Sequence, residues 1–137
     1  MAVPNPYAQY QSNSITTASP DKLLLMAYDG AIRFTKLGQE KLNSGSEIEG
    51  RTFLGKAQAI VAELMMTLNP EASPELVANL ARLYEYIFNR LSEASLNNDI
   101  RAASEVVGIL TDLRDAWFQA AQSLREQSAP EEGRMAA

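Results

Sequence analysis

The chain has 137 residues, a formal net charge of −5, and neither cysteine nor histidine. The absent cysteine excludes disulfides and thiolate chemistry, and the absent histidine removes the commonest general base and metal ligand. Basic residues are scattered, so we expect no nucleic-acid binding. No apolar run approaches the roughly 18 residues of a membrane span, so we expect no membrane insertion. The regions of a signal peptide are missing, so we expect a single domain in the cytoplasm.

Residues 1–18 are predicted to form a polar N-terminal arm. Tyr7 and Tyr10 belong to no predicted helix, and together with Ile15 they can cover apolar surface that the rest of the domain leaves exposed. A tyrosine can bury its ring while its hydroxyl stays in water. This property suits either folding back onto a groove or presentation to a second partner.

The first predicted helix extends from Ser19 to Leu42. Ser19 can cap the free backbone N–H groups, Pro20 stands where its missing donor costs nothing, and Asp21 complements the positive end of the helix dipole. Its apolar residues do not keep to a single stripe but cover more than one face. Such a helix needs neighbours on two sides.

Three further helices follow. The second begins between Ser46 and Arg51 and ends at Asn69-Pro70, and the third begins at Ser73-Pro74-Glu75 and ends near Ser95. The segment Asn97-Asn98-Asp99 serves as a turn and a cap before the fourth helix, whose apolar periodicity extends to Leu124. We therefore predict an all-α fold, an antiparallel up-down-up-down four-helix bundle over residues 19–125, followed by a disordered tail at residues 126–137.

The sequence offers little catalytic chemistry. Without histidine, the ligand sets of di-metal bundles cannot be assembled, and the seven glycines form no phosphate-binding loop. Asp29 is the carboxylate to check, because it lies in the most apolar segment and needs a hydrogen-bond partner there. We expect no catalytic residue, metal or cofactor, and a carboxylate-based enzyme or metal protein is the competing hypothesis.

The excess of apolar residues is more informative. A second apolar stripe lies beside the predicted core stripe on three helices, and for any single residue a wider core explains it. Three helices that share this feature favour a surface groove for the apolar face of a partner helix. The candidate groove residues are Leu54, Val61, Met65, Val77, Tyr84, Phe88 and Ile109. Gly30 and Gly108 lie in the middle of helices, where they either allow close approach of another helix or of a bound peptide, or occupy exposed positions where glycine is neutral.

Several short motifs lie along roughly residues 5 to 124. They are Tyr7-x-x-Tyr10, Ile15-Thr16-Thr17-Ala18-Ser19-Pro20, Met26-Ala27-Tyr28-Asp29-Gly30-Ala31-Ile32, Lys56-Ala57-Gln58-x-Ile60, Glu63-Leu64, Asn79-Leu80-x-x-Leu83-Tyr84-x-Tyr86-Ile87 and Leu113-Arg114-Asp115-Ala116-Trp117. Taken together, these motifs resemble the FliS family of flagellin export chaperones. Ala27 stands where the family more often has leucine before Tyr-Asp-Gly.

The resemblance implies a cytoplasmic, non-enzymatic chaperone that binds the disordered C-terminal segment of flagellin. Such a chaperone prevents premature polymerisation and delivers its client to the flagellar type III export gate. The arm with Tyr7, Tyr10 and Ile15 would then occupy part of the client surface, and Tyr10 would be a candidate contact for the gate. We expect the free protein to be a monomer or a weak dimer. The alternative is an adaptor bundle that binds another flagellar regulator, such as an anti-sigma factor.

Overall fold

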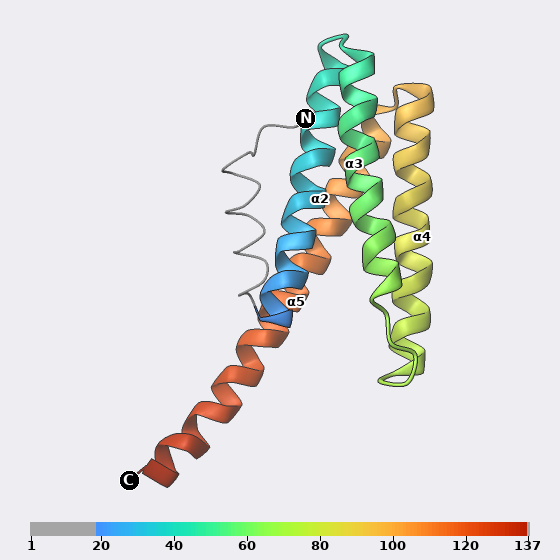
Figure 1. Ribbon diagram of the computed structural model, residues 1–137. Helices are drawn as coiled ribbons and strands as arrows, with labels where there is room; N and C mark the ends of the chain where they lie inside the picture. Colours follow the sequence, from blue (N-terminus) through green and yellow to red (C-terminus); the bar gives the residue numbers. More distant parts are fainter. Residues whose placement is uncertain (1–18, 137) are drawn as a thin grey trace, which may run out of the picture.

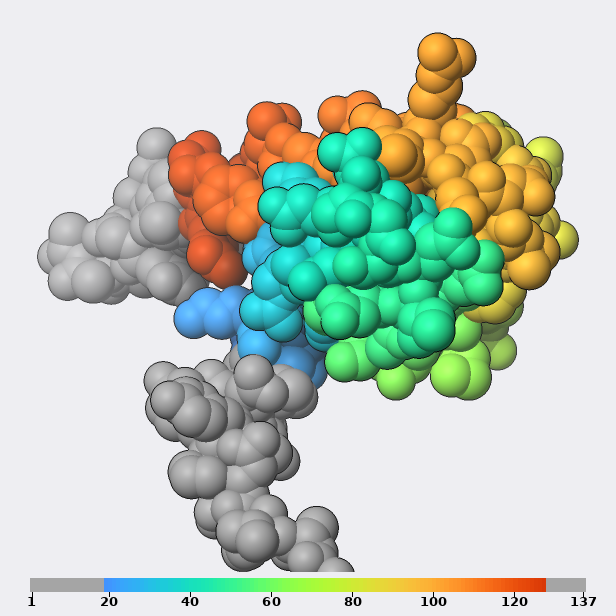
Figure 2. Space-filling view, turned by 90° about the horizontal axis from the view of Figure 1, so that it is seen from above, coloured from blue at the N-terminus to red at the C-terminus, as the bar shows by residue number. Residues whose placement is uncertain are grey.

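A computed structural model describes residues 19–136, and it confirms the predicted all-α bundle. Its helices are α2 (Pro20–Asn43), α3 (Glu47–Met66), α4 (Pro74–Asn97) and α5 (Ile100–Ala136), and no strand occurs within residues 19–136. Each helix packs against two others, in the cyclic order α2, α3, α4, α5. Figure 1 shows the α2–α3 and α4–α5 turns together at one end of the bundle, here called the upper end. Figure 2 looks down on this end, with the α2–α3 turn in teal and the start of α5 in orange. The α3–α4 loop and the start of α2 lie at the opposite, lower end.

Apart from the C-terminal end of α5, the helix ends follow the predicted boundaries closely, and side-chain caps form at some of them. The Ser19 side chain accepts a hydrogen bond from the Lys22 backbone N–H, whereas the side chains of Ser46 and Ser73 make no capping bond. At the α4–α5 turn, Asn98 is left-handed with φ of 51° and Asp99 caps the start of α5. The predicted turn and cap are therefore confirmed here.

The core fills the space between the four helices and contains one buried polar side chain, Thr35, among the described residues. The Thr35 hydroxyl donates to the Ala31 carbonyl oxygen at 2.7 Å, so its burial leaves no unsatisfied donor. The buried apolar residues are Tyr28, Ala31, Leu42, Leu54, Ala57, Val61, Leu64, Leu80, Tyr84, Ile87, Leu91, Ala94, Ala102, Ala103, Val106 and Leu110.

The closest approach recorded at a glycine involves α2 and α3, at Gly38 and Gly50. Both are buried, and a Cβ added at Gly38 would lie 2.7 Å from Leu54 side-chain atoms. At Gly108 the alternative of an exposed position holds within the bundle, because the residue is exposed and a Cβ there would have open space. Gly30 has only a moderate contact, with a Cβ placed 3.2 Å from the Ile60 Cδ1 atom.

The last helix is longer than the sequence indicates. The predicted disordered tail at residues 126–137 is wrong for residues 126–136, because α5 is helical to Ala136. Figure 1 shows this part of α5 projecting beyond the bundle. The segment lacks an apolar stripe and contains Pro130 and Gly133, both poor helix formers, which is why its sequence predicts disorder.

Candidate partner-binding groove

The lower end of the bundle carries an apolar groove. Figure 1 shows the lower part of α5 following α2 and turning away from α4, so that the two helix pairs diverge there. A depression of about 230 Å³ lies between residues of α2, α4 and α5 and the α3–α4 loop. A second depression of about 370 Å³ lies between the start of α2 and the end of α3. Both are lined by Leu24 and Thr67, and together we call them the lower groove.

The lining of the lower groove is mostly apolar. Leu23, Leu24 and Ala27 line it from α2, and Leu76 and Val77 line it from the first turn of α4. These five side chains are half-buried or exposed, and Leu76 is 49% exposed. Covering such a patch with a partner would remove apolar surface from water, and each fully buried leucine contributes roughly 1.5–3 kcal/mol.

A chain of hydrogen bonds crosses the bundle beside this groove. The Trp117 indole N–H on α5 donates to the Tyr28 hydroxyl on α2 at 3.1 Å, and that hydroxyl is hydrogen-bonded to the Tyr84 hydroxyl on α4. Tyr84 and Trp117 both line the groove. Burial raises the pKa of both tyrosines above its ordinary value, and for Tyr84 the hydrogen bond with Tyr28 raises the pKa further. Both hydroxyls therefore stay protonated at neutral pH.

Three of the predicted groove residues lie in the core. Leu54 and Val61 are fully buried and Tyr84 is 1% exposed. The prediction that Leu54 and Val61 line an open groove was therefore wrong, because the stripe that carries them packs against neighbouring helices. Tyr84 is a core residue that also reaches the lower groove.

The other four predicted groove residues, Met65, Val77, Phe88 and Ile109, are only partly buried. Val77 lines the lower groove, whereas Met65, Phe88 and Ile109 are partly buried and pack against the core. Their role in partner binding stays a prediction. Tyr7, Tyr10 and Ile15 lie outside the described residues.

The sequence analysis missed several groove residues, among them Leu23, Leu24, Leu68, Leu76 and Trp117. One signal was available in the first helix, since its apolar residues exceed a single stripe from Leu23 onward. The missing information was the divergence of the helix pairs, which leaves the lower ends of those stripes uncovered.

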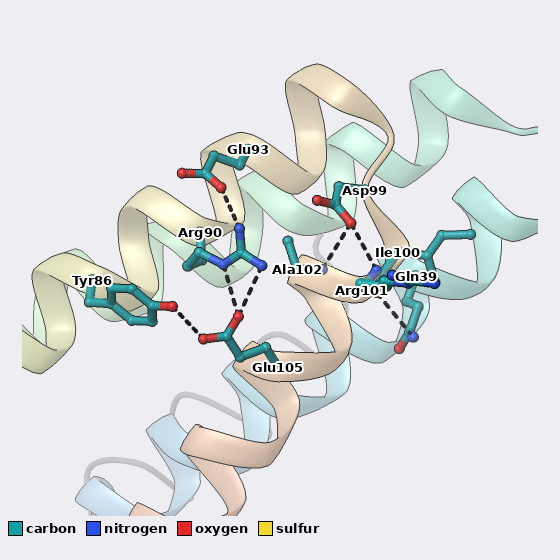
Figure 3. Close-up of polar contacts among 9 residues, drawn as sticks. All are labelled: Gln39, Tyr86, Arg90, Glu93, Asp99, Ile100, Arg101, Ala102 and Glu105. Atoms are coloured by element: carbon teal, nitrogen blue, oxygen red, sulfur yellow. Dashed lines mark hydrogen bonds and ion pairs between the residues drawn. The ribbon is translucent and has the colours of Figure 1, made fainter.

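A surface cluster of polar side chains joins α4 to α5 toward the upper end (Figure 3). Arg90 contacts the Glu105 carboxylate through Nε at 3.0 Å and through a terminal guanidinium nitrogen at 2.9 Å, and it also pairs with Glu93. The Tyr86 hydroxyl donates to the same Glu105 carboxylate. This hydrogen bond and the Arg90 guanidinium hold the pKa of Glu105 below its ordinary value, while Glu105 raises the pKa of Tyr86.

Asp29 is a surface carboxylate. Its side chain is 56% exposed and accepts a hydrogen bond from the Arg114 Nε atom at 3.0 Å, which joins α2 to α5. Among the residues that the structure describes, no group of three or more acidic side chains is placed to hold a metal ion. Asp29 therefore has the partner that its sequence position requires, and that partner is a cation on the surface.

Comparison with known proteins decides the family. The family model described as "Flagellar protein FliS" matches residues 3–124. This chain belongs to the FliS family. It is 42% identical to the flagellar secretion chaperone FliS of Bacillus subtilis (strain 168), over 92% of this chain and 93% of that protein. It is also 36% identical to the flagellar secretion chaperone FliS of Salmonella typhimurium, over 82% of this chain and 85% of that protein.

A solved structure supports the same fold. The crystal structure of a flagellar chaperone from bacteria superposes with a TM-score of 0.72 and 26% sequence identity, covering 85% of this chain and 95% of that one. Membership of the FliS chaperone family implies a role in flagellar export, with partners from that process, and not an enzymatic one. No helix within residues 19–136 is both long and apolar enough to span a membrane.

Proposed function

We propose that this FliS-family protein binds the disordered C-terminal segment of flagellin in the cytoplasm, with the lower groove as a main contact. Binding prevents premature polymerisation, and the complex delivers flagellin to the flagellar type III export gate. The observation that supports this proposal best is the apolar groove between the diverging helix pairs, with Leu76 49% exposed at its edge.

The physical mechanism is competition for one apolar surface. A flagellin helix that will later pack inside the filament carries an apolar stripe, and covering that stripe blocks its association with other subunits. The client must become ordered when it binds, which lowers the net affinity and keeps release possible. The burial of apolar surface should produce a negative heat-capacity change on binding.

The half-buried residues outside the lower groove extend the proposed client surface. Met65, Phe88 and Ile109 pack against the core while part of each side chain stays accessible, so they can contact a client that continues along the bundle. Tyr7, Tyr10 and Ile15 are proposed to occupy part of this surface before the client arrives, and Tyr10 is the proposed gate contact.

Two exposed leucines at opposite ends of α4 provide a matched test. Leu76 lies in the lower groove, whereas Leu96 is 77% exposed in the last turn of the helix at the upper end. Calorimetry with a flagellin C-terminal peptide should show that Leu76→Gln weakens binding about tenfold or more, since a buried leucine contributes roughly 1.5–3 kcal/mol. Leu96→Gln should bind like the wild type. Equal affinities for all three proteins would contradict the proposed site.

A further inference from the structure

The lower groove has one charged side chain among the described residues that line it. Glu63, near the end of α3, lines the depression between α2 and α3 together with Leu23, Leu24 and Ala27. The other described residues that line the two depressions are neutral. A carboxylate therefore stands on a surface that is otherwise uncharged and mostly apolar.

Glu63 has no counter-charge within the described part of the chain. It forms no ion pair there, and Lys22, the cation in the first turn of α2, does not contact it. The helix also disfavours this charge, because Glu63 lies in the last turn of α3, where the helix dipole is negative and no basic residue is present. A residue that breaks a local rule without compensation is typical of a functional position.

Acidic residues outnumber basic ones around the groove. Asp21 and Glu75, in the first turns of α2 and α4, and Glu71, in the α3–α4 loop, adjoin its lining in the sequence, whereas Lys22 is the one described cation that does. The positive ends of α2 and α4 offset part of the charge of Asp21 and Glu75, but Glu63 and Glu71 have no such compensation. The groove therefore favours a partner that brings positive charge.

We propose that the lower groove recognises a segment with a lysine or arginine beside its apolar stripe, and that Glu63 pairs with this cation. The inference rests on the proposed function and makes Glu63 a specificity-determining residue of the same site. On a helix, residues three or four positions apart are neighbours, so a cation can flank an apolar residue that enters the groove. Lysine and arginine suit this position, because their stems cover apolar surface, here Leu23 and Ala27, while the charged group stays in water.

Glu63→Gln removes the charge with almost no change of size. In the full chain at about 0.1 M salt, calorimetry with a flagellin C-terminal peptide should show about threefold to fivefold weaker binding, as for a good ion pair at a surface. At about 1 M salt the screening length falls from about 10 Å to about 3 Å, so the two affinities should converge. The Tm of Glu63→Gln should equal or exceed that of the wild type, because a negative charge leaves the negative end of α3. A structural role for Glu63 would lower Tm instead.

Glu40→Gln is the matched control, since it changes the net charge by the same amount. Glu40 is exposed in the last turn of α2 and lies roughly 24 Å from Leu24 along the helix, at a rise of about 1.5 Å per residue. This separation exceeds the screening length of about 10 Å at about 0.1 M salt, so Glu40→Gln should bind the peptide like the wild type.

The peptide supplies the second half of the test. Each of its lysines and arginines is replaced in turn by glutamine, and one replacement should weaken binding to the wild type but not to Glu63→Gln, because either change breaks the same pair. The pairing is rejected, and the proposed function stands, if Glu63→Gln binds like the wild type, if Glu40→Gln weakens binding equally, or if no replacement couples to Glu63. If the wild type does not bind the peptide at all, the proposed function fails and this inference fails with it.

Discussion

Gly38 of α2 and Gly50 of α3 lie directly against each other. A Cβ added at Gly38 would lie 3.1 Å from the Gly50 carbonyl oxygen, and one added at Gly50 would lie 3.2 Å from the Gly38 carbonyl oxygen. Neither glycine is required by an unusual backbone conformation, since both have ordinary helical geometry. Their role is to let two backbones approach, and this contact fixes the upper half of the α2–α3 pair.

Gly50→Ala is therefore expected to destabilise the fold. The added methyl group meets Leu42 side-chain atoms at 2.7 Å and a backbone oxygen, and such overpacking costs about 1–3 kcal/mol. This cost exceeds the gain of up to about 1 kcal/mol in helix propensity. Gly55→Ala on the same helix is the control, because a Cβ there has open space and should stabilise the protein. Urea unfolding measures both effects, and an equal gain for the two variants would refute the close contact.

A charge at Val61 should unfold the bundle and not merely abolish binding. Val61 is fully buried, so Val61→Asp places a carboxylate in the core without a partner. Ala59→Asp, two residues away on the exposed side of α3, should cost less than about 1 kcal/mol through helix propensity. Circular dichroism during heating distinguishes the two variants. A folded Val61→Asp protein with wild-type stability would contradict the burial.

The Glu105 cluster predicts a pH-dependent contribution to stability. The folded-state pKa of Glu105 lies below the ordinary value of 4.5, so its contribution is complete at neutral pH and is lost as the pH falls below 4.5 through the folded-state pKa. Glu105→Gln should lower Tm at pH 7, and the difference from wild type should shrink at pH 3. Glu85→Gln, at an exposed position of α4 outside the cluster, should show no such convergence. A constant difference for Glu105→Gln would contradict this explanation.

Trp117 should report partner binding directly. It is the single tryptophan of the chain, it is partly exposed, and it lines the lower groove. A flagellin C-terminal peptide that covers the groove should remove water from the indole ring and shift the fluorescence emission to shorter wavelength. The shift should saturate with the same affinity that calorimetry gives. Binding without any change in the Trp117 emission would place the client elsewhere.

The sequence predicts the fold well because local signals and global packing agree. Ser19, Pro20 and the Asn98-Asp99 turn mark helix ends that the structure confirms, and the apolar spacing identifies every helix within residues 19–136. The tail was mispredicted because the end of the apolar stripe near Leu124 does not end the helix, which continues to Ala136.

The candidate site was harder to predict than the fold. Leu54 and Val61 belong to a flanking stripe, but a helix with neighbours on two sides buries both of its stripes, and periodicity does not show which one faces water. Leu76 and Trp117 line the lower groove because the helix pairs diverge at that end, which depends on tertiary packing and not on spacing. The close contact at Gly38 and Gly50 is likewise a property of two helices together.

Methyl NMR of the full chain with a flagellin C-terminal peptide tests the central claim most directly. Leu24, Leu76 and Val77 line the lower groove, whereas the exposed Ile48 and Leu96 lie at the upper end. The account predicts that the largest methyl shifts on peptide addition occur at the three groove residues and that the two upper-end residues stay unchanged. Shifts concentrated at Ile48 and Leu96, or no shift at any of the five, would contradict it.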